Sequence, residues 1–110
     1  MSGAAIVKEA NRYFGYCNWL EGTRERLDNS GFVVMVYKKA TGKSLPHDIG
    51  KLINIGTKVK ANDLQLGDLV FTSSNHVGIY AGNGKFIHFA NDGTIKVSAI
   101  YNFYTARRIL

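Results

Sequence analysis

The spacing of apolar side chains predicts helices in the first half of the chain. After Ser2, a residue type that caps helix N-termini, apolar side chains recur at helical spacing, at Ile6, Ala10, Tyr13 and Phe14. This pattern predicts a helix near residues 4–14. The segment 16–27 is rich in Gly, Glu and Arg and has no apolar period, so we expect a loop there.

The apolar run 32–37 fits either a strand or a helix. Its β-branched residues favour a strand, whereas Lys38 and Lys39 followed by Gly42 are typical of a helix C-terminus. We therefore predict a helix over 30–40, with Asn29 at its N-terminus. A short helix is expected directly after Leu45-Pro46-His47-Asp48.

From residue 58 the pattern changes to short apolar runs separated by turns. The candidate strands are 68–72, 76–81, 85–90, 94–98 and 104–109, with Gly-rich tight turns at 82–84 and 91–93. Helices followed by an antiparallel sheet predict an α+β fold. At 110 residues, without internal repeats, the chain is expected to form a single domain, residues 1–110.

Two histidines in the predicted hairpin share one face. A three-residue Gly-Asn-Gly loop places Ala81 opposite Lys85, and therefore Gly78 opposite His88. His76 is then a diagonal neighbour of His88, roughly 7–8 Å away at Cα. We interpret Gly78 as leaving open space beside the two rings. We expect the pair on the face that meets the N-terminus of the 30–40 helix.

A histidine oriented by a second polar side chain is what nucleophilic catalysis requires of a general base. Two other interpretations of His76 and His88 remain. Each could be a structural histidine with satisfied hydrogen bonds. A zinc site is less favoured, since it needs at least three protein ligands and no Cys-x-x-Cys pair accompanies the two histidines.

The composition indicates a basic domain with a net charge of +6. Its cations are scattered and are not interleaved with aromatic residues, so we expect no nucleic-acid binding but attraction to anionic polymers such as a cell wall. No run approaches the ~20 apolar residues of a membrane span, and no signal peptide is apparent, so we expect a soluble domain. A lone cysteine, Cys17, excludes an internal disulfide.

Six segments, in order and spacing, make the chain similar to the NlpC/P60 family of cell-wall peptidases from about residue 6 to 110. They are Asp28-Asn29-Ser30-Gly31-Phe32-Val33, Leu45-Pro46, Leu66-Gly67-Asp68-Leu69-Val70-Phe71, His76-Val77-Gly78-Ile79-Tyr80, Gly82-Asn83-Gly84-Lys85-Phe86-Ile87-His88 and Arg107-Arg108. In the family, an Asp-Cys-Ser-Gly segment carries the nucleophile and a His-Val-Gly segment carries the base.

The resemblance implies a papain-like α+β core in which Asn29 takes the nucleophile position, His76 the general base and His88 the residue that orients it. It implies peptidoglycan stem peptides as substrate, commonly cut after D-glutamate, no cofactor, and a secreted or cell-wall-facing protein; we expect a monomer. The residues expected to line the substrate cleft are Asp28, Ser30, Tyr16, Cys17, Trp19 and Gly78.

The chain departs from the family pattern at two positions. A carboxamide such as that of Asn29 cannot replace a thiolate as the attacking group. Where the family has Tyr-x-Trp, alignment on Trp19 puts Cys17 at the tyrosine position, which makes Cys17 a conceivable displaced nucleophile.

Three functions follow from the sequence. The first is a peptidoglycan endopeptidase silenced by Asn at position 29, and the second is a natural pseudoenzyme that binds stem peptides or a protein partner. The third is a relative that acts on another amide or ester, such as a lipid acyl group. The lack of an amphipathic membrane-facing segment counts against the third.

Overall fold

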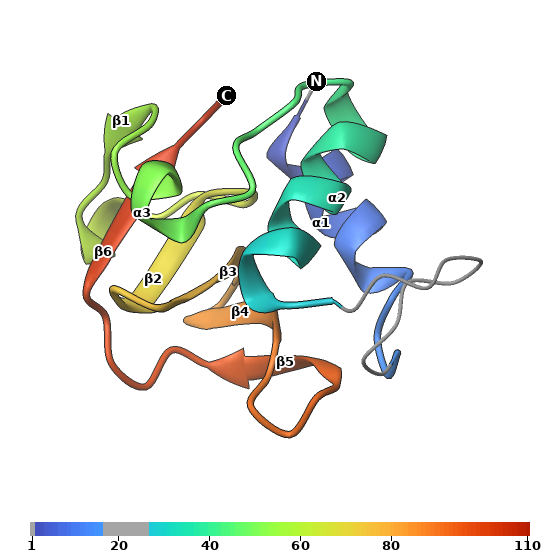
Figure 1. Ribbon diagram of the computed structural model, residues 1–110. Helices are drawn as coiled ribbons and strands as arrows, with labels where there is room; N and C mark the ends of the chain where they lie inside the picture. Colours follow the sequence, from blue (N-terminus) through green and yellow to red (C-terminus); the bar gives the residue numbers. More distant parts are fainter. Residues whose placement is uncertain (1, 17–26) are drawn as a thin grey trace.

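The computed structural model describes residues 2–16 and 27–110 and has the predicted α+β architecture. The helices in the described part are α1 (Gly3–Asn11), α2 (Asn29–Thr41) and α3 (Ile49–Leu52), with a short 3-10 helix at Ala61–Asp63. Figure 1 shows α1 and α2 lying together against the sheet, and α3 near the strands β1 and β6.

The helix α2 has a cap at each end, which resolves the helix or strand ambiguity of its apolar run. At the N-terminus, the Asp28 side chain accepts a hydrogen bond from the Gly31 amide. At the C-terminus, Gly42 has a φ of 77°, and its amide donates to the Lys38 carbonyl. The predicted helix is confirmed and extends one residue further at each end.

The sheet contains six antiparallel strands in the order β1-β6-β2-β3-β4-β5. Their bounds are β1 (Thr57–Lys58), β2 (Leu69–Ser73), β3 (His76–Gly82), β4 (Lys85–Phe89), β5 (Ile95–Ala99) and β6 (Thr105–Arg108). The five predicted strands are present, and every strand end lies within one residue of its expected position. β1 was not predicted, because two residues are too few to show a strand period.

The helices cover one face of the sheet. Val77, Ile79 and Ile87 are fully buried in a core shared with α1 and α2. Because strand side chains alternate between faces, His76 and His88 project from the opposite face. The body of α2 therefore packs on the face opposite the histidines, and Asn29 at its N-terminus lines a pocket together with His76.

The hairpin register is correct in the strands and wrong at the turn. Ile79 pairs with Ile87, which is the predicted register and places Gly78 beside His88. At the turn, however, Lys85 pairs with Gly82 rather than with Ala81, and the pairing shifts between Tyr80 and Gly82. A β-bulge at Ala81 thus absorbs one residue, and the loop between the paired strands is the two-residue Asn83-Gly84.

Candidate active site

The two histidine rings are in direct contact, as predicted. Nε2 of His76 lies 2.7 Å from Nδ1 of His88, and the rings are nearly perpendicular at 85°. Nε2 of His88 lies 2.8 Å from the hydroxyl of Ser98 on β5. Sequence analysis missed Ser98, although the register that places Lys96 opposite His88 and Ser98 opposite Phe86 brings this part of β5 alongside the hairpin.

Burial keeps both imidazoles neutral near pH 7. His76 and His88 are only 8% and 4% exposed. Desolvation lowers the pKa of His76 below its ordinary value of 6.5. Desolvation, followed by repulsion from His76 and Lys96, lowers the pKa of His88 to about 4, against a weaker opposing effect of Asp92. A neutral His76 is the form that can accept a proton.

The hydrogen-bonded row His76, His88, Ser98 links the tautomers of the two rings. If Nε2 of His88 donates to the Ser98 hydroxyl, Nδ1 of His88 accepts from Nε2 of His76, and the lone pair of His76 is on Nδ1. This arrangement suits a general base, because the accepting nitrogen is the one not directed at His88.

Gly78 does not leave open space beside the histidines, which corrects the sequence-based interpretation. A Cβ at this position would lie 2.5 Å from the Phe86 ring, and 2.7 Å from both the His88 Cβ and the Ile87 carbonyl oxygen. The Phe86 ring occupies the space and stacks on His88 with ring centroids 4.1 Å apart. Gly78 is therefore required for close packing.

Asn29 begins α2 next to the start of β3. Its Nδ2 donates to the carbonyl of Asn75 at 3.1 Å, which places it beside His76, and both side chains line one pocket. Its Oδ1 is buried and, among the described residues, the one buried side-chain oxygen or nitrogen without a hydrogen-bond partner. An unpartnered buried acceptor is costly, so the carboxamide fits this position imperfectly.

The neighbours of Asn29 stabilise the start of the helix. The Asp28 carboxylate accepts from the Gly31 amide at 2.6 Å, from His47 Nε2 at 3.0 Å and from the Ser30 hydroxyl at 3.2 Å. Desolvation alone would raise the pKa of Asp28, but these hydrogen bonds, with that from Gly31 the largest, lower it overall. Ser30 is buried. Sequence analysis missed His47, which lies 19 residues from its partner.

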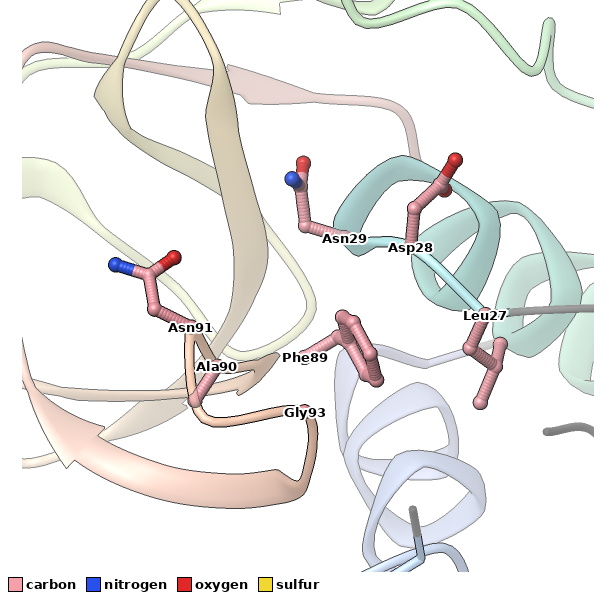
Figure 2. A pocket seen from close by; sticks show the side chains of 7 residues that line it. All are labelled: Leu27, Asp28, Asn29, Phe89, Ala90, Asn91 and Gly93. Atoms are coloured by element: carbon pink, nitrogen blue, oxygen red, sulfur yellow. The ribbon is translucent and has the colours of Figure 1, made fainter. Parts of the chain in front are cut away.

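Two pockets meet at Asn29. The first, of about 490 Å³, lies between the start of α2 and the β4–β5 connection, and Figure 2 shows Asp28 on one side and Phe89 and Ala90 on the other. The second, of about 310 Å³, lies on the His76 side. Asn29 and Asn91 line both, so the two pockets adjoin at these residues. His88 lies buried behind His76.

The remaining expected cleft residues come from the segment before α2. Tyr16 packs edge-on against Tyr13 with ring centroids 5.5 Å apart, and its carbonyl accepts from the Ile95 amide. Cys17 and Trp19 lie outside the described residues, so their predicted place in the cleft stays a prediction. Within residues 2–16 and 27–110, no three His, Cys, Asp or Glu side chains converge as metal ligands would.

Comparison with known proteins identifies the family to which this chain belongs. Residues 15–110 match the sequence profile of the NlpC/P60 family. The chain belongs to the NlpC/P60 family. The crystal structure of the NlpC/p60 domain of the peptidoglycan hydrolase SagA superposes with a TM-score of 0.86, at 30% identity, over 99% of this chain and 100% of that chain. The predicted fold and family are confirmed.

Two curated NlpC/P60 relatives extend the comparison. The chain is 31% identical to the probable endopeptidase NlpC homolog of Haemophilus influenzae over 97% of its length, and it spans 60% of that protein. It is 43% identical to the gamma-DL-glutamyl hydrolase of Bacillus subtilis over 76% of its length, and it spans 21% of that protein.

In the described part of the chain, no helix is long and apolar enough to cross a bilayer.

Proposed function

We propose that this chain is a peptidoglycan hydrolase domain of the endopeptidase type, which recognises stem peptides and is inactive because Asn29 occupies the nucleophile position. The observation that carries the proposal is the intact row His76, His88, Ser98 beside a helix N-terminus that lacks only an attacking group. The relatives named as endopeptidases and as a gamma-DL-glutamyl hydrolase support cleavage next to D-glutamate.

With a thiol at position 29, the site has the parts of a cysteine peptidase. His76 would take the thiol proton, and the thiolate would attack the scissile carbonyl carbon. Amides of the first turn of α2 would stabilise the oxyanion. His76 would then give the proton to the leaving amine, and water would hydrolyse the thioester with His76 again as base. Asn29 removes the nucleophile on which all of these steps depend, whereas the base and the helix amides that would serve them remain.

A natural binding module is the second candidate. It is favoured by the hydrogen bond from Asn29 to the Asn75 carbonyl, which gives the carboxamide a defined place in the site. In this case the two pockets at Asn29 would hold a stem peptide without cutting it. Asp28, on the rim of the first pocket, is the carboxylate available to attract a cationic amine.

The test is restoration of a thiol. We expect the unmodified chain to show no measurable release of free amine from a purified stem peptide, and Asn29→Cys to release it. Asn29→Ala is the matched control, since it opens the same space without a nucleophile. No activity in a folded Asn29→Cys that still binds the peptide would favour the binding module. Activity in the unmodified chain that disappears in Cys17→Ser would identify Cys17 as nucleophile.

A further inference from the structure

The pocket on the His76 side has a lining with unusual chemistry. Among the described residues, none of those that line it is Lys, Arg, Asp or Glu. Besides Asn29 and His76, the lining consists of hydroxyl, carboxamide and aromatic side chains, namely Thr72, Ser73, Asn75, Asn91, Tyr101 and Asn102. An ionic group would find no counter-charge here, whereas a neutral ligand with many hydroxyl and amide groups would find both donors and acceptors.

Tyr101 gives this pocket an exposed aromatic wall. The residue is 62% exposed, yet it has contacts on two sides. Its hydroxyl lies 3.4 Å from the Thr72 hydroxyl, and its ring packs at 62° to the Phe86 ring with centroids 6.2 Å apart. Asn102 anchors the same segment through Nδ2, which donates to the Thr72 carbonyl. The ring is therefore an exposed surface fixed at the pocket.

The pocket on the other side of Asn29 differs in kind. Besides Asn29 and Asn91, which both pockets share, and Gly93, it is lined by the Asp28 carboxylate and by the apolar side chains Leu27, Phe89 and Ala90, as Figure 2 shows. Such a lining suits an aliphatic chain that ends in a cationic amine. A ligand that extends to both sides of residue 29 would thus place an amine-bearing part in one pocket and a neutral, hydroxyl-rich part in the other.

We propose that the neutral pocket is a saccharide subsite in which Tyr101 is the platform for a sugar ring, and that the domain prefers stem peptides still attached to their sugar. This inference rests on the proposed function. In such a glycopeptide, the sugar's lactyl carboxyl is consumed in the amide to the peptide, so the sugar carries no charge. Its hydroxyl and acetamido groups match the uncharged lining, and the flat aromatic face matches the C–H face of the ring.

The test measures binding to the unmodified chain. Because this chain has no nucleophile at position 29, the peptide should not be cleaved during the measurement. The probes are N-acetylmuramyl tripeptide (L-alanine, D-glutamate, diamino acid) and the same tripeptide acetylated at its N-terminus, so that both lack a charged terminal amine. We expect the muramyl peptide to bind about 5- to 10-fold more tightly, equivalent to roughly 1 kcal/mol. Tyr101→Ala is expected to remove this preference, and Tyr101→Phe to keep most of it.

Tyr104→Ala is the matched control. This tyrosine is 59% exposed, lies three residues away and is outside the lining of either pocket, so the preference should be unchanged. Equal affinities of the unmodified chain for both peptides, or a preference that survives Tyr101→Ala, would overturn the sugar subsite and leave the proposed function standing. If neither peptide binds, both fail.

Discussion

The two sides of the site differ in how completely their polar groups are satisfied. On the sheet side, His76, His88 and Ser98 form a continuous hydrogen-bonded row among buried neighbours. On the helix side, the Asn29 amide nitrogen has a partner, whereas its buried oxygen has none. Native proteins rarely leave a buried acceptor unpaired, so the polar groups of residue 29 are satisfied less completely than those of the histidine row.

This difference favours a site built around a different residue at position 29. A thiol has no carboxamide oxygen that requires a hydrogen-bond donor, while the histidine row would serve it unchanged. If the cleft had adapted to binding alone, selection would have had little reason to keep two buried imidazoles with lowered pKa values. Each of the following experiments tests the contrast between the two sides.

The largest expected effect is on catalysis in the Asn29→Cys background. There, His76→Ala removes the base and should lower kcat/KM by about 10³-fold or more. Ser98→Ala leaves the base in place and loosens only the tautomer of His88, so we expect a loss of roughly 3- to 10-fold. The measurement is amine release from a stem peptide. Equal losses in the two variants would show that the row acts as one unit, contrary to the graded roles assigned here.

The second effect is a pH dependence of stability from the sheet side. Because the pKa of His88 is about 4 when folded and 6.5 when unfolded, the unfolded chain takes up a proton first as pH falls. Stability should therefore decline by about 1–3 kcal/mol from pH 6.5 to pH 4. Asp92, with a pKa of about 2 against 3.8, destabilises only at lower pH.

Urea unfolding at pH 7 and at pH 4.5 measures this decline, and His88→Gln separates it from other titrating groups. The variant should lose less stability on acidification than the unmodified chain, although His76 still contributes in the same window. An identical decline in both proteins would mean that His88 does not titrate as its burial requires.

The smallest effect compares two neighbours on the helix side. Asp28→Ala removes the cap of α2 and should lower the free energy of unfolding by about 1 kcal/mol. Asn29→Ala removes an unpartnered oxygen together with one hydrogen bond, so it should be neutral or stabilising by up to about 1 kcal/mol. Chemical denaturation of both variants decides this. A clear loss of stability in Asn29→Ala would show that the carboxamide fits its position after all.

Local signals were sufficient to predict most of the fold. Lys38, Lys39 and Gly42 identified a helix that the β-branched run alone would have suggested to be a strand, since capping chemistry is read directly from sequence. The strand register that brings His76 to His88 was also predictable, because alternation and a short turn define it. The bulge at Ala81 was missed, although Asn83-Gly84, where both residues have a positive φ, is the preferred sequence of a two-residue hairpin turn.

The missed parts of the site depend on contacts between distant segments. Ser98 reaches His88 from the next strand, and His47 lies 19 residues after Asp28 in the sequence, beyond the end of α2. Neither pairing has a periodic signal in the sequence. Gly78 was assigned to the right place and given the wrong role, because only the structure shows that the Phe86 ring fills the space beside it.

The tight packing at Gly78 has a consequence for mutational surveys of this domain. A library selected only for folded, protease-resistant protein should reject every side chain at this position, because even a single methyl would displace Phe86, His88 and the Ile87 backbone. Such a survey would rank Gly78 with the most intolerant positions of the chain without any selection for chemistry. A position next to an active site can therefore reject all substitutions because of packing alone. Only a screen for activity shows whether the residue also has a role in turnover.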